Sequence, residues 1–304
     1  MRRKPRDFSL PRFFFVALVA VPAIAIMLIW FFDRAFPDLA RVIGLLSAVP
    51  FSGATYALTA LWEGSLFVYA IRRTDLGELA RELEPFRALP KTLVEIAGTS
   101  AILVALALGW AIVLPAMLRA ITPALGRAAL RDMDGLFVRD RRILSVAVSF
   151  FALVIVAPIT EELVFRRTLP RVFRRHVSAP TAVIISSVLF GLGHGLARAP
   201  EMAVFGLILC LAYLHRRSFL YIVAIHAGNN IVALFGEPLV HPGNWGLPIG
   251  ILLLLVGAAF GVALIRKEWR YVSRLQALPR VVPVPKRITQ PQPEFLDSIE
   301  GEAR

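Results

Sequence analysis

Long apolar runs separated by short charged segments dominate the chain. The runs fall at about 13–32, 42–62, 96–118, 143–160, 181–197, 202–214, 218–236 and 246–265. Several approach the roughly 20 residues that a helix needs to cross a bilayer, and none alternates apolar and polar residues as a membrane β-strand does. The pattern therefore predicts an all-α fold, a polytopic membrane helix bundle of about eight transmembrane helices. Segment 63–71 either lengthens the second span or lies at the interface.

The composition favours the same class. The chain is 57% hydrophobic and 18% charged, with a mean hydropathy of +0.68, more apolar than ordinary soluble domains. The first run follows a basic leader, but Trp30, Phe31 and Phe32 come after it instead of a small-residue cleavage site. We therefore expect a retained span rather than a removed signal peptide. The single cysteine, Cys210, lies in an apolar run and is expected to be a small buried hydrophobic residue.

The net charge of +13 is explained by membrane topology rather than by nucleic-acid binding. With eight spans both termini share one side, and that side holds 25 of the 34 Lys and Arg residues. The positive-inside rule then predicts cytoplasmic termini, in a multi-pass protein of a bacterial plasma membrane. The six arginines of 119–142 fall on the other side. An interfacial amphipathic segment or a miscounted span would account for them.

The pattern divides the chain into three regions. Residues 1–140 form an N-terminal transmembrane region of about three spans, and residues 141–268 form a transmembrane core. Residues 269–304 are rich in proline and charge, which predicts a flexible cytoplasmic tail.

Polar side chains interrupt the core where a membrane protein tolerates them least. They are Glu161, Glu162, Arg166, His194, His226 and Asn230. A charge at the centre of a membrane helix costs about 2.5–3.5 kcal/mol on insertion scales, so we expect these groups to face a protein-lined cavity. The pattern EExxxR, FxxxH, HxxxN predicts a water-activating catalytic centre inside the bundle.

The two glutamates differ in their helical neighbours. Glu162 and Arg166 are four residues apart and can form an ion pair on one face, whereas Glu161 points about 100° away. A desolvated carboxylate is a stronger base, so Glu161 is predicted to be the general base. To bring Glu161 to the depth of the histidines, the fourth span must continue to about Arg171. Pro158 can kink this helix and free a backbone carbonyl.

The histidines lie in the two later motifs. His194 stands among glycines 191, 193 and 195, which allow a neighbouring helix or a substrate backbone to approach closely. His226 and Asn230 share a helical face and can both donate hydrogen bonds, which suits the oxyanion of a tetrahedral intermediate. Asn229, on a neighbouring face, is a less favoured partner.

Structural interpretations remain open for each motif. His226 and Asn230 can form an interhelical polar contact worth about 1 kcal/mol. The Glu/Arg set can mark a helix end in the headgroup region, with a basic flank of Arg166, Arg167, Arg171, Arg174 and Arg175. Two other histidines, His176 and His215, adjoin basic residues at the edges of apolar runs and are expected at the interface.

A zinc site is the main alternative to metal-free chemistry. Glu161, His194 and His226 could form a two-histidine, one-carboxylate site with an open position for water. The spacing is not HExxH, so no local metal signature supports zinc. We favour a centre without metal or other cofactor.

The three motifs together resemble the family of CAAX proteases and bacteriocin-processing enzymes (CPBP, also called the abortive-infection family), whose members are similar to the type II CAAX prenyl endopeptidase. The resemblance covers roughly 140–236, through the strings APITEELVFRR, SSVLFGLGH and IHAGNN. It implies an intramembrane endopeptidase acting on a peptide or membrane-protein substrate. It also implies residue roles: Glu161 and His194 would activate water, His226 and Asn230 would stabilise the oxyanion, and Glu162 with Arg166 would support the site.

One departure from the family pattern concerns the entrance of the site. Arg167 stands where the family usually has glycine, and it is expected to add bulk and charge there. Two other classes of function remain open: a non-catalytic membrane immunity or scaffold protein that uses the polar network for packing, and a transporter. A prenylated CAAX substrate does not follow from the resemblance, since bacteriocin or signalling-peptide processing fits equally well.

Overall fold

The computed structural model describes residues 64–65, 67–68, 70–72, 74, 76–83, 89–134, 143–235 and 246–276. These residues form helices joined by short turns, without a β-strand among them, which confirms the all-α class. The expected spans 13–32 and 42–62 lie outside the described residues, as does the tail beyond Gln276. The division into three regions stays a prediction.

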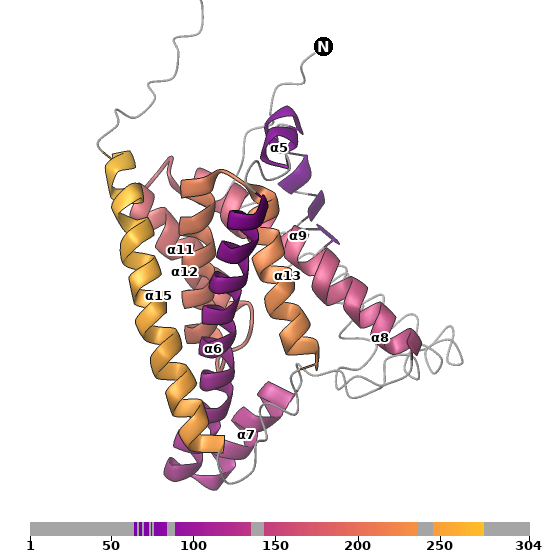
Figure 1. Cartoon of the computed structure of the whole chain (residues 1–304), viewed down its shortest axis with the longest axis vertical. Coiled ribbons are helices and arrows are strands. Elements are labelled where there is room, and N and C mark those ends of the chain that lie inside the picture. Colours follow the sequence, from indigo (N-terminus) through magenta and orange to yellow (C-terminus); the bar gives the residue numbers. More distant parts are fainter. Residues whose placement is uncertain are drawn as a thin grey trace, which may run out of the picture.

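Three described helices are long and apolar enough to cross a membrane: α6 (Leu89–Ile121), α12 (Ala199–Arg216) and α15 (Gly246–Gln276). Two shorter apolar helices, α11 (Ala179–Leu192) and α13 (Phe219–Phe235), stand among them. These five helices correspond to five of the predicted apolar runs, and they form a bundle (Figure 1). The protein is therefore an integral membrane protein built from packed helices.

The remaining elements include one continuous helical path from Ile143 to Phe173. It comprises α8 (Ile143–Phe150), the π-helical stretch η2 (Phe151–Val156), α9 (Ala157–Glu162), the π-helical stretch η3 (Leu163–Thr168) and α10 (Leu169–Phe173). The fourth predicted span thus continues past Arg171, as the depth of the histidines required. π-Helical turns are rare and often accompany functional sites.

Two short helices complete the described residues, α5 (Leu76–Glu82) and α7 (Pro123–Asp134). Helix α7 lies in the arginine-rich segment 119–142 and is amphipathic. Its 12 residues rise about 18 Å, less than the roughly 30 Å of a hydrocarbon core. Its length and amphipathic character favour the interfacial alternative over a miscounted span.

Helices α6 and α15 run side by side along much of their length (Figure 1). Glycine permits this approach, because a Cβ added at Gly109 would lie 2.5 Å from the Leu254 backbone and one at Gly257 would lie 2.7 Å from the Leu106 backbone. Small residues at such contacts are typical of membrane helix pairs. On the outer face of α15, Leu252 and Leu255 are more than half exposed, as expected for side chains that meet lipid.

The core lies between η3, α11, α12 and α13. Its members that are at most 1% exposed include Leu163, Leu169, Phe190, Leu209, Ile222 and Ile225. Cys210 is also 1% exposed and belongs to an adjacent apolar cluster, which confirms its prediction as a buried hydrophobic residue. This core fixes the relative positions of the three helices or turns that carry the polar motifs.

Candidate active site

The turn after α11 carries His194, and this corrects its predicted place on a helix over 181–197. Helix α11 ends at Leu192, where the Gly193 N–H bonds the Leu189 carbonyl. The chain then turns through Gly195, whose φ of 89° lies in the region that favours glycine. The glycines therefore end the helix and turn the chain after His194. Close packing, which the sequence also predicted, occurs at Gly191, where an added Cβ would lie 2.3 Å from the Ala199 carbonyl oxygen.

His226 lies between the two glutamates of α9. Its Nδ1 is 2.7 Å from Glu162 Oε1, and its Nε2 is 3.6 Å from Glu161 Oε2. Adjacent side chains of a helix point about 100° apart, so the two carboxylates are separated. The imidazole ring of His226 lies between them and contacts both. This shared contact with His226 was missed by sequence reasoning, which treated the two glutamates separately.

His194 approaches the same carboxylate from the second motif. Its Nδ1 lies 2.8 Å from the Phe190 carbonyl oxygen, an acceptor, so Nδ1 carries the hydrogen and Nε2 keeps a lone pair. That Nε2 lies 4.0 Å from Glu161 Oε2. The His194 side chain is 23% exposed and Glu161 13%, whereas His226 is 4% exposed. The more open side of the centre is therefore formed by Glu161 and His194.

Glu162 and Arg166 form the predicted i,i+4 ion pair. Arg166 Nε lies 3.0 Å from Glu162 Oε2, and the two side chains are 1% and 0% exposed. The contact is held by charge, because its angles fall outside hydrogen-bond geometry. The guanidinium also stacks over the Phe190 ring, with 3.9 Å from Cζ to the ring centroid. Two buried charges thus balance each other directly behind His226.

Pro158 frees a backbone carbonyl, and Asn230 binds it. In η2 the Ala157 N–H bonds the Ala152 carbonyl, five residues back. The next bond in this register would join the Leu153 carbonyl to residue 158, which is proline and has no N–H. Asn230 Nδ2 instead donates to the Leu153 carbonyl at 2.7 Å. The prediction of a freed carbonyl is confirmed, whereas the oxyanion role of Asn230 stays a prediction.

The same arrangement recurs one π-helical stretch later. The Leu169 N–H bonds the Val164 carbonyl, so the Phe165 carbonyl would next pair with Pro170. Ser186 Oγ donates to the Phe165 carbonyl from α11. Sequence reasoning did not single out Ser186. The sequence does contain an indication of these two freed carbonyls, namely the two prolines at 158 and 170, each of which lies close to charged residues.

Asn229 is more deeply buried than its place in the sequence suggested. It is 6% exposed, and its Oδ1 makes no hydrogen bond with the part of the chain that the structure describes. The two neighbouring amides of α13 therefore differ: Asn230 is bound to a carbonyl of η2, and Asn229 holds a buried acceptor one position away.

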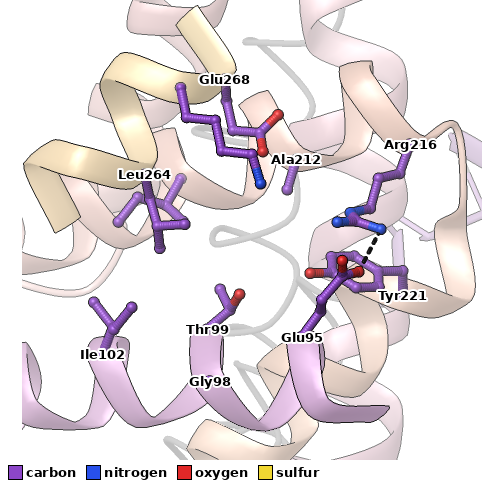
Figure 2. Close-up of a pocket in the computed structure, with 11 residues that line it drawn as sticks. Glu95, Gly98, Thr99, Ile102, Ala212, Arg216, Tyr221, Leu264 and Glu268 are labelled. Carbon is purple, nitrogen blue, oxygen red and sulfur yellow. Dashed lines mark ion pairs between the residues drawn. The ribbon is translucent and has the colours of Figure 1, made fainter. Parts of the chain in front are cut away.

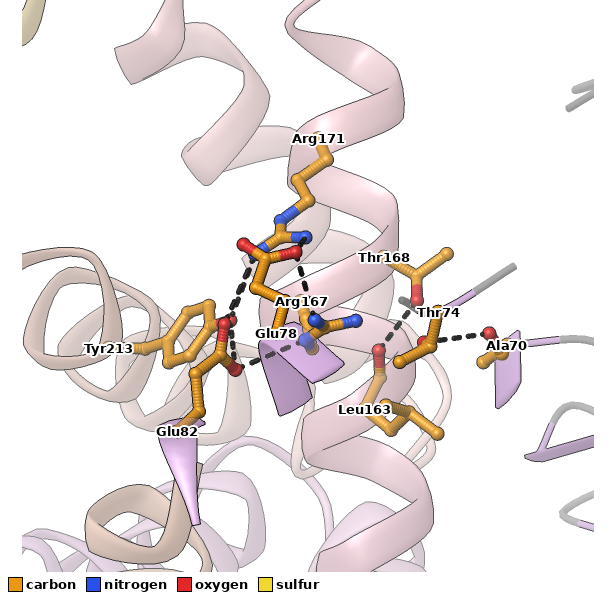
Figure 3. Close-up of polar contacts among 9 residues, drawn as sticks. All are labelled: Ala70, Thr74, Glu78, Glu82, Leu163, Arg167, Thr168, Arg171 and Tyr213. Atoms are coloured by element: carbon orange, nitrogen blue, oxygen red, sulfur yellow. Dashed lines mark hydrogen bonds and ion pairs between the residues drawn. The ribbon is translucent and has the colours of Figure 1, made fainter. Parts of the chain in front are cut away.

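Arg167 binds carboxylates of α5, and its effect on the entrance of the site stays a prediction. It is 2% exposed and binds two carboxylates of α5, with Nε 3.1 Å from Glu82 Oε2 and NH2 3.1 Å from Glu78 Oε2 (Figure 3). Arg171 contacts the same carboxylates at 2.8 and 3.3 Å, and the Tyr213 hydroxyl donates to Glu82 at 2.9 Å. We call these five residues the α5 charge cluster. The sequence indicates this cluster through two i,i+4 pairs of opposite charge. Two glutamates in α5 are four residues apart, as are the arginines at 167 and 171.

The remaining histidines lie apart from this centre. His215 Nδ1 is 2.5 Å from Glu268 Oε2 and links α12 to α15. His176 lies exposed in the turn after α10. Neither contributes to the group around Glu161.

The zinc alternative can be tested on the geometry of Glu161, His194 and His226. Nitrogen and oxygen ligands of a tetrahedral zinc ion lie about 3.3 Å apart. Here the two Nε2 atoms are 4.0 and 3.6 Å from Glu161 Oε2. Over the described ranges, no group of three or more His, Cys, Asp and Glu side chains could hold a metal ion. The three side chains thus lie a few tenths of an ångström farther apart than zinc ligands do, and the preference for metal-free chemistry stays a prediction.

Comparison with known proteins supports the motifs. Residues 143–232 match the family model described as "Type II CAAX prenyl endopeptidase Rce1-like". No curated protein and no solved structure shows a significant match to the chain. The family match runs from the start of α8 into α13, and so contains all six predicted site residues. It supports neither a metalloprotease nor an abortive-infection designation. The match supports the assignment of residues 143–232 to the family of CAAX proteases and bacteriocin-processing enzymes, which their three motifs predicted.

Proposed function

We propose that the chain is an intramembrane endopeptidase in which Glu161 activates a water molecule for attack on a peptide bond. The observation that carries this proposal is the position of Glu161 Oε2 within 4.0 Å of the Nε2 atoms of both His194 and His226. Separations of 3.6–4.0 Å are long for direct hydrogen bonds and suit groups that share a water molecule.

Each group in the centre has a defined task in this reaction. Glu161 takes a proton from the water, while the His194 Nε2 lone pair accepts the second O–H and orients it. The water oxygen then bonds to the carbonyl carbon and produces an oxyanion. Glu161 passes its proton to the leaving nitrogen as the C–N bond breaks, which yields a carboxylic acid and an amine.

His226 is placed to stabilise the oxyanion. Glu162 accepts from its Nδ1, so an oxyanion donor on Nε2 requires the imidazolium form. The two carboxylates beside the ring offset part of the cost of burying that charge, in the way that a buried aspartate supports the histidine of a serine protease. Arg166 contacts the Glu162 carboxylate from the other side. Asn230 would contribute a second donor through the amide hydrogen that does not bind Leu153.

The substrate proposed is a peptide or membrane protein cleaved near the membrane surface. The family description names a prenyl endopeptidase, but nothing in the described site distinguishes a prenylated peptide from another one. A bacterial plasma membrane with both termini in the cytoplasm remains our proposal for location, from the distribution of Lys and Arg.

The experiment that tests this function is the replacement Glu161→Gln. Peptides from membranes of wild-type and variant cells identify a candidate substrate, and the purified full-length proteins are then compared on it. Removal of a general base should lower the rate about 10²–10⁴-fold. Glu95→Gln is the matched control, because Glu95 pairs with Arg216 away from the centre.

The competing function is a membrane scaffold that uses the polar network for packing, favoured by the burial of Glu162 and Arg166. It predicts that Glu161→Gln, which preserves shape and hydrogen bonding, keeps the phenotype of the cell. A folded Glu161→Gln protein that cleaves the substrate at the wild-type rate would contradict the proposed peptidase mechanism.

A further inference from the structure

A half-open pocket of about 220 Å³ lies apart from the candidate active site, between α6, α12, α13 and α15 (Figure 2). None of Glu161, His194 and His226 lines it. Helix α6 lines it with Glu95, Gly98, Thr99 and Ile102, and α12 with Ile208, Ala212 and Arg216. Helix α13 contributes Tyr221, and α15 contributes Leu264, Lys267 and Glu268. Nothing in the proposed reaction uses this pocket.

The pocket forms where α6 and α15 diverge. At the other end of this helix pair the contact is close, because an added Cβ at Gly109 would lie 2.5 Å from the Leu254 backbone and one at Gly250 would lie 2.5 Å from the Ile112 side chain. At Gly261 the nearest atom would already be 3.4 Å away, and at Gly98 nothing lies within 4 Å. The space beside Gly98 is therefore open, although the same two helices are in close contact farther along.

Polarity changes along the pocket in one direction. Arg216 is the last residue of α12, and the apolar Ala212 and Ile208 lie one and two turns before it. On α15 the charged pair 267–268 lies one turn beyond Leu264, and on α6 Glu95 lies two turns before Ile102. The pocket thus has a charged rim at one end of the bundle and an apolar interior.

The carboxylates of the rim already have partners. Glu95 Oε2 lies 2.7 Å from Arg216 NH1, and Glu268 Oε2 lies 2.5 Å from His215 Nδ1. Lys267 forms no ion pair with any residue that the structure describes. Arg216 has further N–H groups beyond the one that meets Glu95. The rim therefore presents donors for an anion.

We propose that this pocket binds a phospholipid of the surrounding bilayer, with its phosphodiester at Lys267 and Arg216 and part of one acyl chain along Ile102, Ile208 and Leu264. A charged rim above an apolar interior fits an amphiphile and not a free phosphate. The rim also lies on the side that the positive-inside rule makes cytoplasmic, where anionic phospholipids carry the negative surface charge. This site is independent of the proposed peptidase function.

Native mass spectrometry of the purified full-length protein, titrated with phosphatidylglycerol in detergent, tests the proposal. Gly98→Leu fills the pocket without a backbone clash and should weaken binding of the tightest lipid about tenfold, the effect of about two lost methylene contacts. Lys267→Gln should weaken it about fivefold, as one lysine near an anionic surface does. Glu161→Gln protein should bind the lipid like wild type.

Two matched variants serve as controls. Ala97→Leu adds the same side chain at an exposed position of α6 next to the pocket, and Lys91→Gln removes an exposed lysine from the same helix. Both should bind lipid like wild type. Equal affinity in all five variants would show ordinary boundary lipid and overturn the proposal, and so would displacement of the lipid by millimolar inorganic phosphate. If Gly98→Leu proves unstable, the contrast between Lys267→Gln and Lys91→Gln decides alone.

Discussion

The α5 charge cluster tests how burial determines the contribution of an ion pair to the free energy of unfolding. Glu82 is 8% exposed and faces Arg167, which is 2% exposed, at 3.1 Å. Replacing Glu82 by Gln removes the negative charge and leaves Arg167 buried with only Glu78, which is 37% exposed. The Tyr213 hydroxyl also loses its charged acceptor.

The expected cost follows from these exposures. Breaking a fully buried ion pair destabilises a protein by about 3–5 kcal/mol. Because Glu78 still contacts Arg167, we expect about 2–3 kcal/mol for Glu82→Gln, the range of a lost hydrogen bond to a charged group. Arg171→Gln is the matched control in the same cluster. Its side chain is 38% exposed, and its loss should cost at most about 1 kcal/mol.

The assay is reversible unfolding of the purified full-length protein in mixed micelles, followed by helical circular dichroism for each variant. A double-mutant cycle with Glu82→Met and Arg167→Met then separates the free energy of the ion pair from the cost of burying each charged side chain. Since two apolar side chains can replace a buried pair at little cost, the double variant should be at least as stable as the less stable single one. Equal costs for Glu82→Gln and Arg171→Gln, both under about 0.5 kcal/mol, would refute the argument from burial.

Three further predictions concern the candidate site. Asn230→Ala should destabilise the protein by about 1–3 kcal/mol because the Leu153 carbonyl loses its partner, and Pro158→Ala, which restores an N–H, should recover part of this loss in the same unfolding assay. Chelation with 1,10-phenanthroline should leave hydrolysis unchanged; stoichiometric zinc, with activity lost on chelation and restored by zinc, would contradict this. Trp110→Phe removes the 2.8 Å bond from Nε1 to the Ala197 carbonyl in the turn after His194, and should lower kcat several-fold without changing KM.

The sequence was most informative where periodicity and charge act locally. Apolar runs predicted the apolar helices of the bundle, and the i,i+4 rule predicted the Glu162–Arg166 pair, because both depend on one helix alone. The place of His194 was wrong, since an apolar run does not show where glycine lets the chain turn. The contacts of Arg167 were not predicted. Its partners lie more than 80 residues away in α5, and only tertiary packing could reveal them.

The prolines explain why so many polar groups of the core meet along a single helical path. Each π-helical stretch ends one residue before a helix whose second residue is proline, at 158 and at 170. Each proline leaves one carbonyl without a backbone donor, and a side chain from another helix supplies it: Asn230 from α13 and Ser186 from α11. The bent path is thereby bonded to the helices that precede His194 and carry His226, on both sides of Glu161. Departure from regular helix geometry therefore helps to hold the three motifs together.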